Sequence, residues 1–185
     1  MRTEAEKKLF TTNDFSKMFD AGILNNDERV ELVDGEIIKL NPGKRHVACS
    51  LRANMLFSEA FGRRACVSVQ NPVVIDLYNE PKPDVVILKA REDFYATVEP
   101  SPEHALLIVE ISDTTLAMDQ KRKLSKYAKG NVPEYWIEDL RNQLLHVYRD
   151  PSRGEYKTHL TLRRDETISA LAFPDVQFKV ADLLG

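Results

Sequence analysis

The sequence predicts a mixed α/β or α+β fold in which helices flank a central sheet. Short apolar runs lie at residues 66–76, 84–89 and 105–111, as expected of strands in a protein core. Apolar residues recur at helical spacing in residues 11–24, 45–61 and 116–129. At 185 residues the chain suits one domain, long enough to bury a sizeable core.

The composition is that of a soluble globular protein, with 43% apolar and 30% charged residues. No apolar run approaches the roughly 18–20 residues that span a bilayer. The start, "MRTEAEKKLF", has no apolar signal core, so we expect a cytoplasmic protein without a membrane partner. Cys49 and Cys66 match no metal-binding spacing, and we expect buried, reduced thiols rather than a disulfide. The net charge of −3 argues against a surface coated for non-specific nucleic-acid binding but allows a local basic groove.

The N-terminal half reads as helix, hairpin and helix. The first helix begins at a polar Thr/Asn/Asp stretch and ends at Gly22. Asp34-Gly35, the favoured dipeptide for a tight hairpin, separates two short strands in "RVELVDGEIIKL". The second helix runs from about Arg45 to Phe61 and ends at Gly62. Its buried face is expected to contain Val47, Leu51, Asn54 or Met55, and Ser58.

In the C-terminal half, "KAREDFYATVEPSPEH" is polar, contains two prolines and is expected to be a surface loop. The helix at 116–129 ends at Gly130, and Leu116, Leu124, Tyr127 and Ala128 form its expected buried stripe. "EYWIED" and "QLLHVYR" read as strands around a turn at 140–142, with the next turn at "DPSRG". Tyr135 and Trp136 could stack on bases, but their alternation with Ile137 favours packing in the sheet.

Two acids in apolar strands are the main functional signal. Asp84 heads the run "DVVIL", and Glu110 lies near the end of "ALLIVEIS". If the strands are neighbours, about 4.8 Å apart, both carboxylates can reach one point, where they would repel each other. A hard divalent cation relieves that repulsion, and Mg²⁺ suits one or two carboxylates plus water and phosphate oxygens. The alternative is that each acid caps its strand and faces solvent.

Lys123 is the candidate cation for such a site. It lies four residues before Tyr127, at the margin of the buried stripe, so its ammonium could reach the end of the sheet. The alternative is an i,i+4 ion pair with Asp119, and Asp119 could also orient Lys123. Lys123 belongs to the segment "KRKLSKYAK", which contains five basic residues and no acid. This segment is either a solvated helix face or a basic surface that neutralises a nucleic-acid backbone.

Several short stretches occur together in a specific order. They are "ELVDGEII" (31–38), His46 at the start of the following helix, "PKPDVVIL" (81–88), "LLIVEISDTT" (106–115), Asp119, Lys123 and Tyr127 in "DQKRKLSKY", and "VPEYWIEDL" (132–140). By these stretches the chain resembles the Uma-two family of "putative restriction endonucleases", in the PD-(D/E)XK nuclease superfamily. The resemblance covers about residues 10–184 and implies a restriction-endonuclease-like single domain over 1–185.

The resemblance implies roles for several side chains. Asp84 corresponds to the aspartate of the superfamily motif and Glu110 to its second acid, and together with Glu31 they would hold Mg²⁺ or Mn²⁺. The superfamily commonly has its lysine two residues after the second acid, where this chain has Ser112. Similar family members take the lysine from the following helix, which corresponds to Lys123. Residues expected to contact substrate or support the site are His46, Gln70, Asp119, Lys121, Arg122 and Lys126.

The leading hypothesis is a metal-dependent endonuclease that hydrolyses phosphodiester bonds in DNA. Asp84 and Glu110 would hold the ion, while Lys123 would position the attacking water and steady the charge on the phosphorane. One alternative is a nuclease-like fold used only for binding or regulation, which the displaced lysine and the negative net charge favour. Another is the same chemistry on RNA or a repair intermediate. A homodimer is expected by analogy with restriction-type nucleases.

Overall fold

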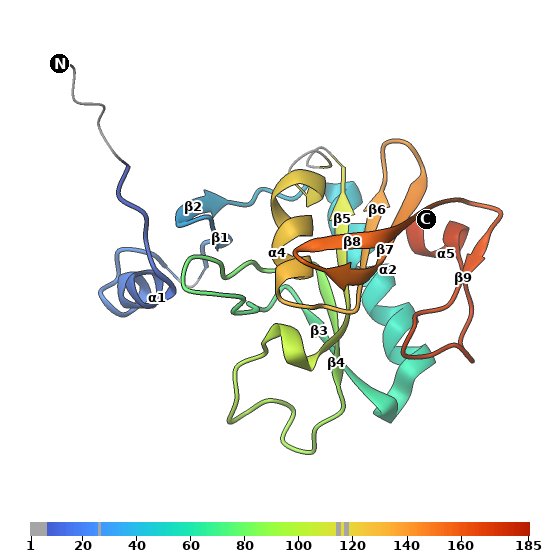
Figure 1. Cartoon of the computed structure of the whole chain (residues 1–185), viewed down its shortest axis with the longest axis horizontal. Helices are drawn as coiled ribbons and strands as arrows, with labels where there is room; N and C mark the ends of the chain where they lie inside the picture. The colour runs from blue at the N-terminus through green and yellow to red at the C-terminus, as the bar shows by residue number, and fades with distance from the viewer. Residues whose placement is uncertain (1–6, 26, 114–115, 117–118) are drawn as a thin grey trace.

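A computed structural model shows a six-stranded mixed sheet flanked by helices, which confirms the predicted fold class (Figure 1). The structure describes residues 7–25, 27–113, 116 and 119–185. The strand order is β3-β4-β5-β6-β7-β8, and every neighbouring pair is antiparallel except the parallel pair β5–β6. The strands are β3 (Ala65–Val69), β4 (Val85–Lys89), β5 (Ala105–Ser112), β6 (Glu134–Asp139), β7 (Leu144–Ser152) and β8 (Glu155–Arg163).

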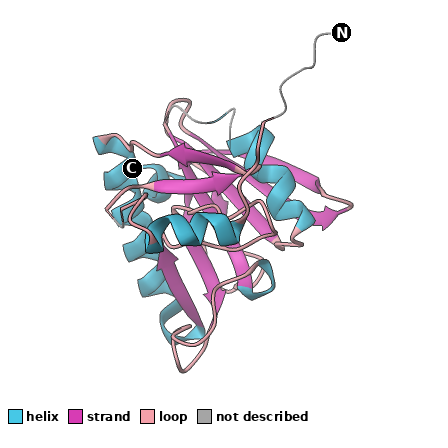
Figure 2. Cartoon of the chain, turned by 90° about the vertical axis from the view of Figure 1, so that its left-hand side faces the viewer, coloured by secondary structure: helices cyan, strands magenta, loops and turns pink. Residues whose placement is uncertain are grey.

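Helices pack on both faces of this sheet, so the chain has two apolar layers (Figure 2). On one face, α2 (Lys44–Phe61) and α5 (Val180–Leu184) cover a core that includes Trp136. On the other face, the π-helical segment η3 (Asp119–Lys123) and α4 (Leu124–Lys129) form the crossover between the parallel strands β5 and β6. Parallel neighbours require such a crossover, since a tight hairpin cannot join them.

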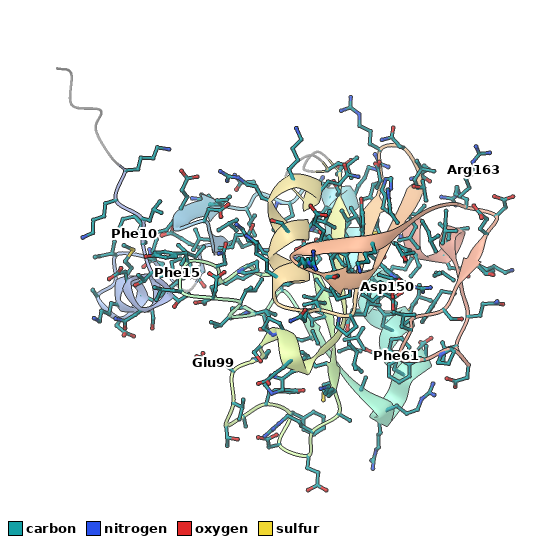
Figure 3. The ribbon with its side chains drawn as sticks, viewed as in Figure 1. Phe10, Phe15, Phe61, Glu99, Asp150 and Arg163 are labelled. Atoms are coloured by element: carbon teal, nitrogen blue, oxygen red, sulfur yellow. The ribbon has the colours of Figure 1, made fainter. Side chains whose placement is uncertain are left out.

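The N-terminal part forms a smaller layer of its own. Helix α1 (Thr12–Asp20) begins with a capping box between Thr11 and Asp14. The hairpin β1 (Val30–Val33) and β2 (Glu36–Lys39) turns at Asp34-Gly35, as predicted, and both turn residues have positive φ. Figure 3 shows Phe10 and Phe15 together in this part, far from Phe61 on α2.

The remaining elements are short. They are η1 (Gly62–Arg64), η2 (Pro102–His104), β9 (Thr167–Ile168) and β10 (Phe178–Lys179). Strands β9 and β10 pair with each other near the C-terminus. Residues 90–101 contain no regular element, in agreement with the predicted surface loop. In the part of the chain that the structure describes, no helix has the length and apolarity needed to cross a membrane.

The predicted buried face of α2 is wrong, although its predicted bounds are correct to within one residue. Val47, Leu51 and Met55 are exposed, Leu51 to 66%. The helix instead buries Cys49, Ser50, Ala53, Phe57 and Phe61. Both sets have helical spacing, but the second carries two phenylalanines that pack against Trp136 and Phe178. Aromatic side chains bury the largest apolar area, so they determine which face of the helix turns inward.

Two further sequence predictions need adjustment. The strand predicted at 66–76 ends at Val69, because Gln70 adopts a left-handed backbone with φ of 54° and Pro72 follows soon after. In the predicted stripe at 116–129, Tyr127 and Ala128 are buried, whereas Leu116 and Leu124 are only half-buried. Tyr135 and Trp136 are fully buried, which confirms the packing interpretation over base stacking.

Candidate active site

The two strand acids, Asp84 and Glu110, lie at the same end of the sheet. Strands β4 and β5 are antiparallel neighbours in which Val85 pairs with Val109, so one step further places Asp84 opposite Glu110. Asp84 also reaches across to β5, where its Oδ2 accepts a hydrogen bond of 2.8 Å from the Ile111 backbone N–H. The two acids, 26 positions apart in the sequence, therefore form one cross-strand pair.

Helix α2 supplies a partner for Asp84. His46, in the first turn of this helix, places its Nε2 2.7 Å from Asp84 Oδ1. Asp84 thus has a contact on each oxygen, one from the helix and one from the neighbouring strand. Its carboxylate is held in a fixed orientation at the end of the sheet.

Lys123 lies between two buried carboxylates. Its Nζ is 3.0 Å from Glu110 Oε1 and 3.1 Å from Glu31 Oε2. The three side chains are each no more than 5% exposed, so Lys123 is buried and does not sit at the margin of a helix face. Glu31 comes from β1 of the hairpin, where it also accepts a hydrogen bond of 3.1 Å from the Lys82 N–H. The hairpin, the sheet and the crossover helix therefore meet at this lysine.

Tyr127 is a member of this cluster that the sequence assigned only to packing. Its hydroxyl donates a hydrogen bond of 2.9 Å to Glu110 Oε1, the same oxygen that Lys123 contacts. Burial, together with the nearby carboxylate of Glu110, raises the pKa of Tyr127 well above its usual range. The signal in the sequence is the spacing of four residues between Lys123 and Tyr127, which places both on one side of a helix.

Among the side chains that the structure describes, the charges of the site do not balance. Glu31, Asp84 and Glu110 carry three carboxylates against the one ammonium of Lys123, a formal sum of −2 with a neutral His46. Glu31 Oε1 is buried and has no hydrogen-bond partner in the described structure. Surplus buried negative charge is costly unless a cation compensates it.

The donor set fits a hard divalent ion. Carboxylate oxygens are the ligands that Mg²⁺ prefers, and one or two of them suffice when water and substrate phosphate complete the shell. Asp84 and Glu110 could supply these two. Among the described residues no three His, Cys, Asp or Glu side chains already converge as a metal-binding group, and Lys123 stands between Glu31 and Glu110.

A further buried acid, Glu138 on β6, lies behind the site and was not found from the sequence. Its Oε2 accepts a hydrogen bond of 2.9 Å from the Cys49 thiol on α2. Burial raises the pKa of Glu138 to about 8, and the nearby charge of Asp84 acts in the same direction. Burial also raises the pKa of Cys49. Cys49 and Cys66 are both free thiols, as expected, but only Cys49 is buried as predicted and Cys66 is half-buried.

The hairpin carboxylates contact two of the predicted substrate-binding residues. Arg122 donates a hydrogen bond of 3.1 Å to Glu36 Oε2, and the Lys126 ammonium pairs with the Asp34 carboxylate. Lys121 is exposed. The basic segment thus faces the acidic hairpin on one side and solvent on the other.

Two other predicted supporting residues have different outcomes. The Gln70 backbone N–H lies 3.2 Å from the carbonyl oxygens of both Pro83 and Asp84, so Gln70 is next to the site through its main chain. The Asp119 backbone begins η3, but its side chain lies outside the described part of the structure, so its predicted role in orienting Lys123 stays a prediction.

Comparison with known proteins gives the family. The profile of the Uma2 family, described as "Putative restriction endonuclease", matches residues 13–181. The chain belongs to this family. Uma2 membership confirms the resemblance drawn from the sequence and places the chain in a nuclease family.

A solved structure is similar over nearly the whole chain. It is described as "Crystal structure of a putative nuclease belonging to DUF820 from Anabaena variabilis ATCC 29413" and aligns with a TM-score of 0.71 at 16% identity. The alignment covers 95% of this chain and 97% of that one, so the two share a fold. A search of curated proteins finds no match.

Within this Uma2 protein, Ser112 occupies the position two residues after Glu110. It is buried, and its backbone carbonyl accepts a hydrogen bond of 2.9 Å from the Leu140 N–H, which extends the link between β5 and the end of β6. The lysine that contacts Glu110 comes from the crossover helix instead. A lysine ammonium therefore lies beside Glu110, but it comes from a residue 13 positions later in the sequence.

Proposed function

We propose that this Uma2 protein is a metal-dependent endonuclease that hydrolyses phosphodiester bonds in DNA. The observation that carries the proposal is the gathering of three carboxylates at one end of the sheet, where Glu31 and Glu110 contact Lys123 and Asp84 contacts His46. Mg²⁺ or Mn²⁺ would be held by Asp84 and Glu110, with Glu31 contributing its charge nearby. When bound, such an ion polarises a phosphoryl oxygen and lowers the pKa of water.

The chain's own residues would prepare the reaction. His46 and the Ile111 N–H fix the Asp84 carboxylate, so this ligand would need no rearrangement when the ion binds. Lys123, held beside Glu110, would orient the attacking water and offset the negative charge that develops on the phosphorane. The buried surroundings strengthen this electrostatic effect, because a low local dielectric screens it less than water does.

Binding of the DNA backbone would involve the basic segment of η3 and α4. Lys121 is exposed and can contact a phosphate directly. Arg122 and Lys126 can do so only if phosphates replace the carboxylates of Glu36 and Asp34. Such an exchange of one anion for another costs less than desolvating a free cation. Substrate binding would therefore compete with the hairpin for these two residues.

Plasmid cleavage tests the proposal. Supercoiled DNA should be nicked or linearised with Mg²⁺ or Mn²⁺ and left intact with a chelator, since a closed circle offers no end to an exonuclease. Asp84→Asn and Glu110→Gln should each abolish cleavage while keeping the size of the side chain. Asp175→Asn, an exposed acid paired with Arg64 away from the site, is the matched control and should cleave normally. Undiminished cleavage by both site variants would overturn the proposal.

A binding or regulatory module without catalysis is the second candidate. The displaced lysine supports it, because Ser112 stands where the superfamily commonly carries that residue. Calorimetric titration with Mn²⁺ distinguishes the two. A catalytic site should bind Mn²⁺ and lose it in Asp84→Asn and Glu110→Gln, whereas a module should bind nucleic acid without any Mn²⁺ affinity at millimolar concentration.

Substrate and assembly are tested separately. A panel of duplex DNA, single-stranded DNA, RNA and nicked or branched repair intermediates, each with Mn²⁺, shows which nucleic acid is cut. We expect DNA. We also expect a homodimer, since two copies would cut both strands of a duplex. Size-exclusion chromatography with light scattering should show twice the 21.2 kDa of one chain, and a monomer at micromolar concentration would contradict this expectation.

A further inference from the structure

We infer that Tyr127 is a positioning residue for the proposed active site, fixing which oxygen of Glu110 is presented to the ion. This inference rests on the proposed function. It starts from a shared acceptor, because the Tyr127 hydroxyl and the Lys123 ammonium both contact Glu110 Oε1, at 2.9 Å and 3.0 Å. Two donors on one oxygen make the two oxygens of this carboxylate unequal.

The Tyr127 hydroxyl serves as a hydrogen-bond donor to Glu110. A carboxylate offers only lone pairs, so the single phenolic proton points to Glu110. Tyr127 therefore acts through Glu110.

The ring of Tyr127 is held rigidly. It is fully buried, and its centroid lies 4.9 Å from that of Tyr135 at an interplanar angle of 56°. The backbone is also fixed, since the Tyr127 carbonyl accepts a hydrogen bond of 3.0 Å from the Val132 N–H after the helix ends. A hydroxyl on a ring packed this way cannot follow Glu110 if the carboxylate rotates, so it selects one rotamer.

The consequence concerns Glu110 Oε2. With Oε1 turned toward Tyr127 and Lys123, Oε2 is the oxygen that can approach an ion shared with Asp84. Without the hydroxyl, Glu110 keeps its contact with Lys123 but loses the Tyr127 contact that helps to define the carboxylate plane. Partners that orient a metal ligand in this way typically contribute about 10–100-fold to metal affinity or activity.

The test compares Tyr127→Phe with Tyr156→Phe. Each substitution removes one tyrosine hydroxyl from the same aromatic cluster, but Tyr156 is half-buried and its hydroxyl donates to the Val132 carbonyl and not to the site. Calorimetry should show Mn²⁺ affinity about 10–100-fold weaker in Tyr127→Phe and unchanged in Tyr156→Phe. Plasmid cleavage at saturating Mn²⁺ should show a lower kcat with an unchanged KM for DNA in Tyr127→Phe only.

A double-mutant cycle shows whether Tyr127 acts through Glu110. Because Glu110→Gln already removes Mn²⁺ affinity, the cycle is measured on the free energy of unfolding of the metal-free proteins, and Tyr127→Phe should destabilise the wild type more than it destabilises Glu110→Gln. Wild-type Mn²⁺ affinity in a folded Tyr127→Phe protein, or an equal loss of stability in both backgrounds, would overturn the inference while leaving the proposed function intact. If the wild-type protein itself neither binds Mn²⁺ nor cleaves DNA, the proposed function fails first and this inference with it.

Discussion

Two buried ionic clusters in this protein differ in how completely their charges are matched. In one, Glu134 on β6 accepts hydrogen bonds from Trp136 Nε1 at 2.8 Å, from Arg149 Nε at 2.7 Å and from the Leu171 N–H at 2.6 Å. One carboxylate faces one guanidinium, and both Glu134 oxygens have donors. This cluster joins β6, β7 and the C-terminal segment, and it requires no further ligand.

The other cluster, at the end of β4 and β5, has more carboxylates than cations. Glu31 and Glu110 share Lys123, Asp84 adds a third acid, and Glu31 Oε1 is buried without a donor in the described structure. The contrast indicates that burial of charge alone does not mark a functional site. A cluster with matched charges stabilises the fold. A cluster with surplus charge lowers the stability of the folded protein, and binding of a cation can remove this penalty.

Glu138 illustrates a third way to accommodate a buried acid. Within the described part of the chain it forms no ion pair with a basic side chain, and its pKa of about 8 means that it holds a proton at neutral pH. Counter-charge, excess charge and protonation thus occur in the surroundings of three buried glutamates, Glu134, Glu110 and Glu138, on the neighbouring strands β5 and β6. Each of these three arrangements makes a different prediction for substitution.

The largest expected effect is on stability, in the balanced cluster. Glu134→Gln leaves the Arg149 guanidinium largely buried without its counter-charge, which should lower the free energy of unfolding by about 3–5 kcal/mol. Urea denaturation followed by circular dichroism measures this change, and Asp175→Asn serves as the exposed control. Mn²⁺ affinity should stay at the wild-type value if the protein remains folded. A loss below about 1 kcal/mol would contradict the assigned role of this cluster.

The next effect is a pH dependence from Glu138. Burial holds its pKa at about 8 against an ordinary value of 4.5, so between these values the folded protein binds a proton that the unfolded chain releases. Its contribution to stability is complete below about pH 4.5 and is lost as the pH rises through 8. The slope should approach about −1.4 kcal/mol per pH unit. Denaturation at several pH values should show this slope in the wild type but not in Glu138→Gln.

Glu31→Gln tests the unbalanced cluster with the same chemical change as Glu134→Gln but the opposite expected sign. Removing one of three carboxylates should raise the unfolding free energy of the metal-free protein by up to about 1 kcal/mol, since surplus buried charge is relieved. With saturating Mn²⁺ the order should reverse, because the variant binds the ion less tightly. Thermal melts with and without Mn²⁺ measure both. Destabilisation of the metal-free variant by several kcal/mol would show that Glu31 is structural, like Glu134.

The sequence was sufficient for the parts of this molecule that depend on local patterns. Asp34-Gly35 specified the hairpin, and "DVVIL" and "LLIVEIS" specified neighbouring strands whose acids meet. Apolar spacing also located α2, but it could not select the buried face, because two faces were available and the choice depended on what Phe57 and Phe61 would meet. That information lies in other strands and in the C-terminal segment.

The same limit applies to the site. Lys123 was expected near Glu110. Its contact with Glu31 could not be predicted, because it depends on where the hairpin lies in three dimensions. The hydrogen bond from Tyr127 to Glu110 Oε1 likewise depends on how the helix packs against the sheet. Glu138 was missed because an acid alternating with apolar residues also fits a strand with one solvated face. The pairing of the basic segment with hairpin acids was also missed, since no short-range pattern links Arg122 to Glu36.

The smallest expected effect lies at the contact between Glu36 on the hairpin and Arg122 on η3. Hydrogen bonds from Lys7 and then Arg122 lower the pKa of Glu36, so it stays ionised and competes with phosphate for Arg122. Glu36→Gln should leave stability nearly unchanged and bind DNA more tightly, because Arg122 becomes available to a phosphate. The slope of log K, the association constant for DNA, against log[salt] should become steeper by about 0.9.

Asp20→Asn is the control, because it changes the net charge equally at an exposed position on α1, and it should leave that slope as it is. Fluorescence anisotropy with a chelator present measures binding without cleavage, and equal slopes for both variants would mean that Arg122 does not contact the DNA backbone.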